Sequence, residues 1–485
     1  MTQAGHEGRH AGRHAPNRRL LSAAMLGVAS GAILVPLNST MLAVALPDVM
    51  GEFALDASAV TSLVTLYLGA VAIALPLGGA IGDRYGHRRA FVAGVLGFAV
   101  ASALAALGPS FELLEIARVA QAATGALIST SAASLIRQTT PLDRQGEAFG
   151  TFDLLVSTSA AVGPFVGGLL VGGFGWRSLF VLAVPIGIVS AGFVGLALRP
   201  AATETPERHS HRHRAPIDVP GLALLALAIV AFLVALRAPG ETLGIAAAVA
   251  IVPLLAGFVT VELRTDRPAV DPRLLVHPPF AAAALGVFGS TVILHGTFIL
   301  VPLTVEEVLR EGATTSGLVL LGLAGVGAIV SPFGGRISDR RGRRSIVVAG
   351  SLVSAAGLAA LAIPGAAVSA ATIAVLLGIV GLGNGLTSAR QAAALESVGT
   401  SHVGMAAGTY YTARYLGGVV GASAAGAILG AQVTAPGVGT GFAVLAVVGV
   451  AVALASLGLP GRPPGHDGPT RTLDDLPQDG LLPFR

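Results

Sequence analysis

Long segments without charge constrain this chain more than any other feature of its sequence. Twelve segments of 18 residues or more contain no Asp, Glu, Arg or Lys, at 20–47, 57–82, 90–111, 119–136, 154–176, 178–198, 219–236, 242–261, 274–305, 312–335, 345–389 and 415–461. A helix needs about 20 apolar residues to cross the hydrocarbon core of a bilayer. The last two segments are about twice that length, and Pro364-Gly365 and Pro436-Gly437 lie where a helical hairpin would turn. The sequence therefore predicts an all-α polytopic membrane protein with fourteen transmembrane helices.

Composition excludes most classes of soluble protein. Charged residues make up 12% of the chain, whereas soluble domains have about 25%. All 30 basic residues are Arg, and they cluster between the apolar segments, a pattern typical of membrane orientation rather than nucleic-acid binding. The absence of Lys excludes a Walker P-loop, and the absence of Cys excludes disulfides and thiolate metal sites. We expect a protein that is not an enzyme and holds neither a cofactor nor a metal.

The positions of Arg also predict the orientation of the helices. When the loops are assigned alternately to the two sides, starting with the amino terminus inside, the outer set receives only Arg177, Arg237 and Arg310. Cytoplasmic loops of membrane proteins carry an excess of Lys and Arg. We therefore expect a multi-pass protein of the plasma membrane with both termini in the cytoplasm.

The same reading divides the chain into seven segments. They are a cytoplasmic tail (1–19), a six-helix half (20–198), a cytoplasmic linker (199–216), an inserted helix pair (217–263), a cytoplasmic loop (264–279), a second six-helix half (280–460) and a disordered cytoplasmic tail (461–485). The linker is polar and rich in charge. We interpret its alternating His209, His211 and His213 as part of a solvated run rather than as a metal site.

A charged phrase occurs twice, as GGAIGDRYGHRR at 78–89 and GGRISDRRGRR at 334–344. Asp83 and Asp339 are 256 positions apart, and the flanking Gly and Arg residues keep the same offset. Each copy joins the second and third predicted helices of its half. Repetition of one loop at equivalent points of two multi-helix halves is typical of transporters built from structural repeats.

With these motifs the chain resembles the fourteen-helix drug:proton antiporter branch of the major facilitator superfamily, over about residues 20–460. The family's loop signature, Gly-x-x-x-Asp-Arg-x-Gly-x-Arg, is met twice. The resemblance implies that this loop is a cytoplasmic latch that stabilises the outward-facing state; the alternative is a set of positive-inside anchors. The latch residues are Gly79, Asp83, Arg84, Gly86 and Arg88, and Gly335, Asp339, Arg340, Gly342 and Arg344.

Two further family patterns lie in the fourth and fifth predicted helices. Arg-x-x-Gln-Gly is met by Arg118 and Gln121, with Ala122 in place of the Gly. The exporter pattern Gly-Pro-x-x-Gly-Gly is met in full by Gly163, Pro164, Gly167 and Gly168. Pro164 lacks an amide proton, so we expect a bend there, with the glycines allowing close packing.

The first helix departs from the family pattern. Many members carry an Asp in a phrase similar to NSTMLAVALP, where this chain has Asn38. Because Asn cannot titrate, a coupling role at this position cannot be transferred. The remaining candidates for proton coupling are Asp153 and His295, titratable residues within apolar segments, and Arg118, which either modulates a protonation site or forms a structural pair with Glu115. Candidates for lining a substrate cavity are Asn38, Gln121, Tyr410, Tyr411 and Arg414.

These features predict a secondary active exporter of small amphipathic molecules that works by proton antiport and alternating access. Its expected partners are a small-molecule substrate, protons and the lipid bilayer, without nucleic acid, and we expect a monomer. The alternatives are an exporter of one dedicated metabolite or a facilitator without proton coupling. Both stay open because Asn38, at the position of the family's Asp, cannot titrate.

Overall fold

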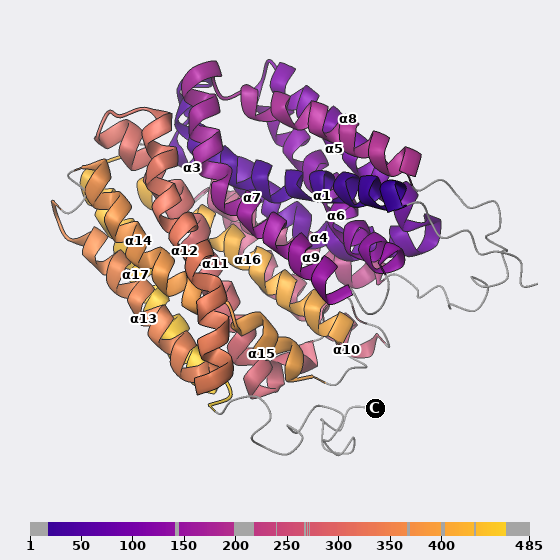
Figure 1. The fold of residues 1–485 in the computed structure, drawn as a ribbon. Coiled ribbons are helices and arrows are strands. Elements are labelled where there is room, and N and C mark those ends of the chain that lie inside the picture. Colours follow the sequence, from indigo (N-terminus) through magenta and orange to yellow (C-terminus); the bar gives the residue numbers. More distant parts are fainter. Residues whose placement is uncertain are drawn as a thin grey trace, which may run out of the picture.

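The computed structural model describes residues 18–140, 145–197, 218–238, 240–265, 268, 270, 272–365, 369–398, 403–430 and 433–461, which form the helical bundle of Figure 1. These residues contain helices and no strand. The predicted linker at 199–216, and all but the last two residues of the predicted amino-terminal tail, lie outside this set, as does the predicted carboxyl-terminal tail beyond residue 461. In chain order the helices are α1 (Arg18–Met41), η1 (Leu42–Ala45), α2 (Leu46–Glu52), α3 (Ala57–Val60), α4 (Ser62–Tyr85), α5 (His87–Leu107), α6 (Phe111–Thr139), α7 (Gln145–Phe174), α8 (Ser178–Ala197), α9 (Val219–Arg237), α10 (Thr242–Arg264), η4 (Pro272–Val276), α11 (Pro278–Leu303), η5 (Thr304–Val308), α12 (Ala313–Arg341), α13 (Arg343–Ala362), α14 (Ala370–Leu386), α15 (Arg390–Glu396), α16 (Val403–Leu429), α17 (Ala435–Ala455) and η6 (Ser456–Gly458).

Twelve helical segments within the described residues are long and apolar enough to cross a membrane. α9 has a shorter apolar part, Val219–Ala235, and α16 is not among the twelve. The predicted hairpin at Pro364-Gly365 separates α13 from α14, with Gly365 at a positive φ of 85°. α16 begins well before the uncharged segment at 415, because Arg414 lies inside the helix instead of bounding it.

The helices up to α8 and those from α11 onward pack in the same order, and we call these two groups the N-terminal half and the C-terminal half. α1 packs against α7 and α8 as α11 packs against α16 and α17. α6 packs against α4 and α5 as α14 packs against α12 and α13, and α5 meets α8 as α13 meets α17. α9 and α10 pack against each other, and α9 also contacts α4. The repeat seen in the sequence is therefore repeated in the helix packing.

Each copy of the repeated loop is a one-residue break between two helices. α4 ends at Tyr85 and α5 begins at His87, with Gly86 between them at φ 92°. α12 ends at Arg341 and α13 begins at Arg343, with Gly342 between them at φ 89°. Glycine adopts positive φ without the steric cost that a Cβ brings. The second Gly of the signature is thus required by backbone geometry in both copies.

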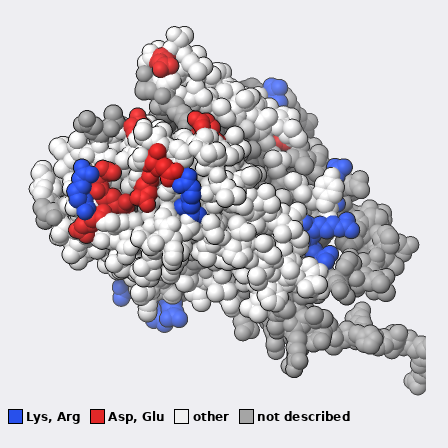
Figure 2. Space-filling view, turned by 90° about the horizontal axis from the view of Figure 1, so that it is seen from above, with Lys and Arg blue, Asp and Glu red and all other residues white. Residues whose placement is uncertain are grey.

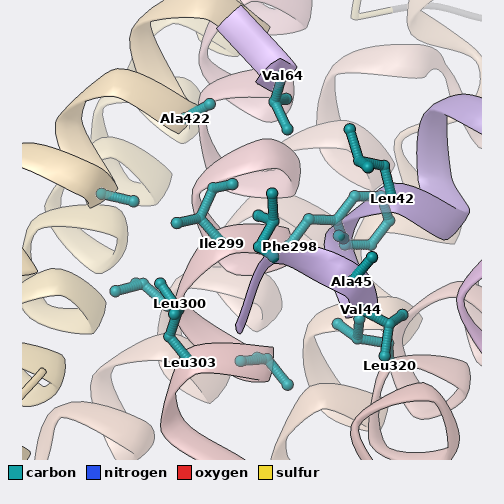
Figure 3. Close-up of a cluster of buried hydrophobic side chains, with 14 of the residues drawn as sticks. Leu42, Val44, Ala45, Val64, Phe298, Ile299, Leu300, Leu303, Leu320 and Ala422 are labelled. Atoms are coloured by element: carbon teal, nitrogen blue, oxygen red, sulfur yellow. The ribbon is translucent and has the colours of Figure 1, made fainter. Parts of the chain in front are cut away.

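The two halves share one hydrophobic core at one end of the bundle and each has a core of its own at the other, while a further cluster places α9 and α10 between α4 and α16. We call the end that carries the two repeated loops the latch end and the opposite one the far end. The far-end core combines side chains of both halves, among them Leu42, Val44 and Val64 with Phe298, Leu303 and Leu320 (Figure 3). At the latch end, one core includes Phe91 and Leu135 of the N-terminal half only, and another includes Phe280 and Val347 of the C-terminal half only.

Candidate functional site

One seam between the halves is a close approach of α7 and α12. Gly168 faces α12, where an added Cβ would lie 2.6 Å from the carbonyl oxygen of Ala313 and 3.1 Å from Cα of Gly317. A Cβ at Gly317 would lie 2.5 Å from the carbonyl oxygen of Pro164. Thr314 Oγ1 donates a 3.0 Å hydrogen bond to the Gly168 carbonyl across the seam. The helices meet backbone to backbone, which only small residues permit.

The glycine motif predicted in the fifth helix, α7, therefore contacts two helices, α1 and α12. Gly163 and Gly167 face α1, and a Cβ at Gly167 would lie 3.0 Å from the carbonyl oxygen of Met41. Gly168 faces the other half. Pro164 lies inside α7, which continues as one helix from Gln145 to Phe174.

The second seam joins α4 and α16. A Cβ at Gly418 would lie 2.9 Å from Leu68 Cδ1, and one at Gly426 would lie 2.5 Å from Thr61 Oγ1. α16 begins at the latch end, so these contacts occupy its middle and its far-end part. Both seams lie toward the far end, which is closed, while the latch-end cores remain separate.

The side-chain contacts of the described latch loop of the N-terminal half stay within that half. Asp83 Oδ1 lies 3.1 Å from His87 Nε2, one turn along the chain, and the Asp83 side chain is 79% exposed. Its partner is thus a histidine of the same loop and not an Arg. Arg84 stacks over the ring of Tyr85 at 5.6 Å. The side chain of Asp339, at the matching position, lies outside the described residues.

The last Arg of each latch copy binds the sixth helix of its own half. Arg88 Nη2 donates a 2.8 Å hydrogen bond to the carbonyl of Gly195, near the end of α8. Arg344 Nε donates one of 2.8 Å to the carbonyl of Leu459, which follows η6. Cations are stabilised near helix carboxyl ends, where carbonyl groups lack helical donors. These residues thus fasten the loop to its own half.

The first Gly of each signature is not a point of close helix approach. A Cβ at Gly79 or Gly335 would meet no atom within 4 Å. The close approach occurs one residue earlier: a Cβ at Gly78 would lie 3.0 Å from the carbonyl oxygen of Ala126, and one at Gly334 would lie 2.7 Å from that of Gly385. One residue rotates a helix face by about 100°, which places Gly79 and Gly335 on open faces of their helices.

Arg118 is the centre of a buried polar cluster in the N-terminal half. Its side chain is 1% exposed. Nη1 donates to Asn38 Oδ1 at 2.7 Å and to Gln121 Oε1 at 2.9 Å, and Nε donates to the Leu63 carbonyl at 3.3 Å. The guanidinium also lies 4.0 Å from the centre of the Tyr67 ring. Asn38 and Gln121 are therefore occupied inside this half instead of facing an open cavity.

Glu115, predicted on the same face, accepts a hydrogen bond from Ser62 of α4. Gln121 Nε2 in turn donates to Ser102 Oγ of α5 at 2.8 Å. The polar residues of α6 thus join three helices of the N-terminal half.

Arg390 is a second buried guanidinium, in the C-terminal half, that the sequence analysis did not single out. It is 3% exposed. Nη1 donates to Ser290 Oγ at 2.6 Å and to the Gly286 carbonyl at 2.9 Å, and Nη2 donates to Ser351 Oγ at 3.3 Å. Using charges to mark the ends of helices treated Arg390 as a boundary, whereas the apolar helical segment Ala370–Glu396 contains it.

Arg414, Tyr410 and Tyr411 lie together on α16. Tyr410 is buried and Arg414 is exposed. The two tyrosine rings meet edge to face at 6.1 Å, and Tyr411 Oη accepts a 3.1 Å hydrogen bond from Gln391. Thr291 Oγ1 of α11 donates to the backbone carbonyl of Arg414 at 2.8 Å. The contacts of these three residues therefore join α16 to α11 and α15.

His295 and Asp153 lie in different halves. His295 Nδ1 is 3.1 Å from the Thr291 carbonyl, and its ring meets Phe298 edge to face at 6.2 Å. Asp153 lies in α7, but its side chain is outside the described part of the structure. α7, which carries Asp153, packs mainly against α1 and α12, whereas α16 packs mainly against α11 and α4.

Charge is unevenly distributed between the two ends. In Figure 2 the acidic side chains gather in one patch, and most of the visible Arg side chains lie away from it. Acidic residues of the far-end elements α2, η5 and the segments beside them are Asp48, Glu52, Asp56, Glu306, Glu307 and Glu311. There Arg177 donates two 2.7 Å hydrogen bonds to Glu52, which raise the pKa of Arg177.

Metal-ligand geometry does not occur in the described part of the chain, where no three His, Asp or Glu side chains cluster. His209, His211 and His213 lie outside it, as does a His-Glu-x-x-His spacing at 6–10. A small cavity inside the C-terminal half, with room for about one water molecule, is lined by Ser290, Ser351 and Asn384 among others.

Comparison with known proteins gives consistent matches. The family profile described as Major Facilitator Superfamily matches residues 28–422. An uncharacterized MFS-type transporter, YvkA of Bacillus subtilis, is 31% identical over 88% of this chain and 94% of its own length. The tetracenomycin C resistance and export protein of Streptomyces glaucescens is 30% identical over 84% of this chain and 76% of its own. The lincomycin resistance protein LmrB of Listeria monocytogenes is 28% identical over 71% and 73%.

Solved structures with the same fold have little sequence similarity. A D-xylose–proton symporter matches with a TM-score of 0.63 at 14% identity, over 91% of this chain and 98% of its own. A POT family transporter in complex with 5-aminolevulinic acid matches with a TM-score of 0.65 at 15% identity, over 91% and 96%. These two comparisons bear on the fold alone.

Proposed function

The chain belongs to the Major Facilitator Superfamily and is a membrane transporter, not an enzyme, and on that premise we propose that it exports small amphipathic molecules, antibiotics among them, by proton antiport. Relatives with about 30% identity are named for resistance to, or export of, such compounds. The proposed site is the space between the two halves, and its proposed partners are protons, the substrate and the bilayer, with the protein working as a monomer.

The proposed location is the plasma membrane, with the latch end and both termini in the cytoplasm. The supporting observation is charge: Arg residues dominate the latch end and acidic residues the far end. We also propose that α9 and α16 cross the membrane, which gives fourteen spans, with α9 and α10 as a pair inserted between two six-helix halves. Their mutual packing and the matched packing order of the halves favour this arrangement.

One observation supports alternating access: the two halves share a core at the far end, whereas the two latch-end cores are separate from each other. Two rigid halves joined at one end can rock about that contact and open each end in turn. In the proposed orientation the structure corresponds to the inward-facing state. The exposure of Asp83 then fits a latch that engages the other half only when the cytoplasmic end closes.

For proton coupling we propose Asp153 and His295 as carriers and Arg118 as the charge that tunes them. Asn38 stands where the family pattern has an Asp, and it accepts a 2.7 Å hydrogen bond from Arg118. This observation also favours the second candidate function, a facilitator without proton coupling or an exporter of one metabolite.

Inverted membrane vesicles that carry this protein and a pH gradient test the proposal. We expect candidate compounds to dissipate the gradient through the wild-type protein, and Asp153→Asn to weaken this coupling while downhill flux persists. Downhill flux without any proton movement in the wild type would favour the facilitator. Unchanged coupling in Asp153→Asn would remove Asp153 and leave His295 as the carrier to test.

A further inference from the structure

Gly418 belongs to the α4/α16 seam, and Arg414 lies one helical turn from it. Gly418 contacts Leu68 of α4 and His295 of α11, with an added Cβ 2.9 Å from Leu68 Cδ1 and 3.1 Å from His295 Nδ1. Arg414 precedes Gly418 by four residues, so it lies on the same helix face and one turn nearer the latch end. Its side chain is exposed. Arg414 therefore lies on the face of α16 that meets α4 and α11, one turn nearer the latch end than Gly418.

The described side chains that interact electrostatically with Arg414 are a histidine and two tyrosines. Its guanidinium lies within electrostatic range of His295, Tyr410 and Tyr415. Among the described residues its side chain has no hydrogen-bond or ion-pair partner, and its backbone is held by Thr291. An exposed guanidinium whose charge no described residue balances is available to bind an anion through charge-assisted hydrogen bonds.

A second cation strengthens this positive field. Tyr410 lies within electrostatic range of both Arg414 and Arg390. Arg390 is buried behind it, and its hydrogen bonds go to two serine hydroxyls and one carbonyl. No described carboxylate lies within ion-pair distance of either guanidinium. Tyr410 therefore interacts with two positive charges that no described acid balances.

We infer that the transported substrates are organic anions, amphipathic molecules whose carboxylate or other single acidic group binds Arg414. This inference rests on the export function proposed above and gives it a substrate class. The planar guanidinium donates two parallel hydrogen bonds to a carboxylate. Tyr410 and Tyr411 supply aromatic surface for the apolar body, and Gln391 fixes the Tyr411 hydroxyl at 3.1 Å.

Two dyes that share a xanthene body but differ in charge test the inference. Proteoliposomes with the purified full-length protein are given a pH gradient, and the transport of anionic fluorescein and of cationic rhodamine 123 is measured. We expect wild-type protein to move fluorescein and Arg414→Gln to reduce its rate about tenfold or more because a charge-assisted hydrogen bond is lost. Arg414→Lys should fall between the two, because it keeps the charge but not the two parallel hydrogen bonds.

Arg310→Gln is the matched control, since it removes the same charge from a side chain that is 77% exposed at the far end. Transport of rhodamine 123 but not fluorescein overturns the anion inference and leaves the export function standing. Equal fluorescein rates in wild type and Arg414→Gln overturn it as well. If neither dye moves faster than in protein-free vesicles, the inference and the export of amphipathic molecules both fail.

Discussion

Arg118 keeps its charge inside the N-terminal half through neutral hydrogen-bond acceptors. A charge at the centre of a membrane helix costs about 2.5–3.5 kcal/mol even on insertion scales. Asn38, Gln121 and the Leu63 carbonyl accept from three directions, and the Tyr67 ring covers one face. Hydrogen bonds to charged groups contribute about 1.5–3 kcal/mol each, so this set offsets the cost.

Replacing Asn38 tests that balance. Asn38→Leu removes the acceptor 2.7 Å from Arg118, and because the guanidinium stays buried we expect the protein to lose about 1–3 kcal/mol of stability. Asn38→Asp keeps the acceptor and adds an opposite charge, so its melting temperature should equal or exceed that of the wild type. Thermal unfolding in detergent measures both. An Asn38→Leu variant as stable as the wild type would show that Asn38 does not support Arg118.

Residue-level prediction succeeded where the signal was local. A charged residue within an apolar helix marked Arg118, and helical spacing placed Gln121 on its face, which their 2.9 Å hydrogen bond confirms. Asn38 is 80 positions away in sequence, and no periodicity links it to Arg118. Arg390 was missed because a charge was taken as the end of a helix. Inside the protein, its guanidinium donates hydrogen bonds to two serine hydroxyls that are distant in sequence.

At the scale of the element, α7 and α12 approach so closely that one methyl group matters. We expect Gly317→Val to force these helices apart, because its Cβ would lie 2.5 Å from the Pro164 carbonyl oxygen and 3.1 Å from Cα of Gly168. If the substitution favours the open far end by about 1.4 kcal/mol, the ratio of open to closed protein rises about tenfold. Transport should fall accordingly, and a single cysteine placed in the seam should label faster.

Gly173→Val is the control for this change. It lies in the same helix α7, where an added Cβ meets no atom within 4 Å. Its transport and labelling should match the wild type. If Gly317→Val behaves as this control does, the seam is not a tight contact during transport.

The helix breaks in the repeated loop give a second prediction. Gly86→Ala forces a Cβ-bearing residue to φ 92°, which we expect to cost about 1–3 kcal/mol of stability. Gly79→Ala, in the interior of α4 with open space around its Cβ, should instead gain about 0.5–1 kcal/mol from higher helix propensity. Melting temperatures of the two variants should move in opposite directions; a destabilised Gly79→Ala would contradict the open-space assignment.

Helix existence was easier to predict than helix contacts. Uncharged length located the apolar helices because the bilayer imposes that length on any spanning helix. Uncharged length did not locate the start of α16, because Arg414 lies inside that helix. It also did not distinguish Gly78, which faces a neighbouring helix, from Gly79, which faces open space. The loop repeat predicted two matched halves, and the packing order agrees with it.

At the scale of the whole molecule, the distribution of the cores decides which motion is possible. The far-end core crosses between the halves directly, each of the two latch-end cores belongs to one half, and a further cluster connects α4 to α16 through α9 and α10. Within one half, helices are joined by many buried side chains, so each half moves as a unit. The weakest boundary is the interface between the halves, and glycine-lined seams at its far end let that interface separate with little rearrangement of side chains.

A reversible cross-link across the α7/α12 seam tests this motion directly. A Cβ at Gly172 would lie 3.7 Å from Cβ of Thr314, within the range of disulfide geometry, about 3.5–4.5 Å. The chain has no cysteine, so Gly172→Cys with Thr314→Cys introduces the only pair. Oxidation should lock the far end closed and stop transport, and reduction should restore it, while each single variant should respond to neither treatment. Transport at the wild-type rate by fully cross-linked protein would reject alternating access through separation of this seam.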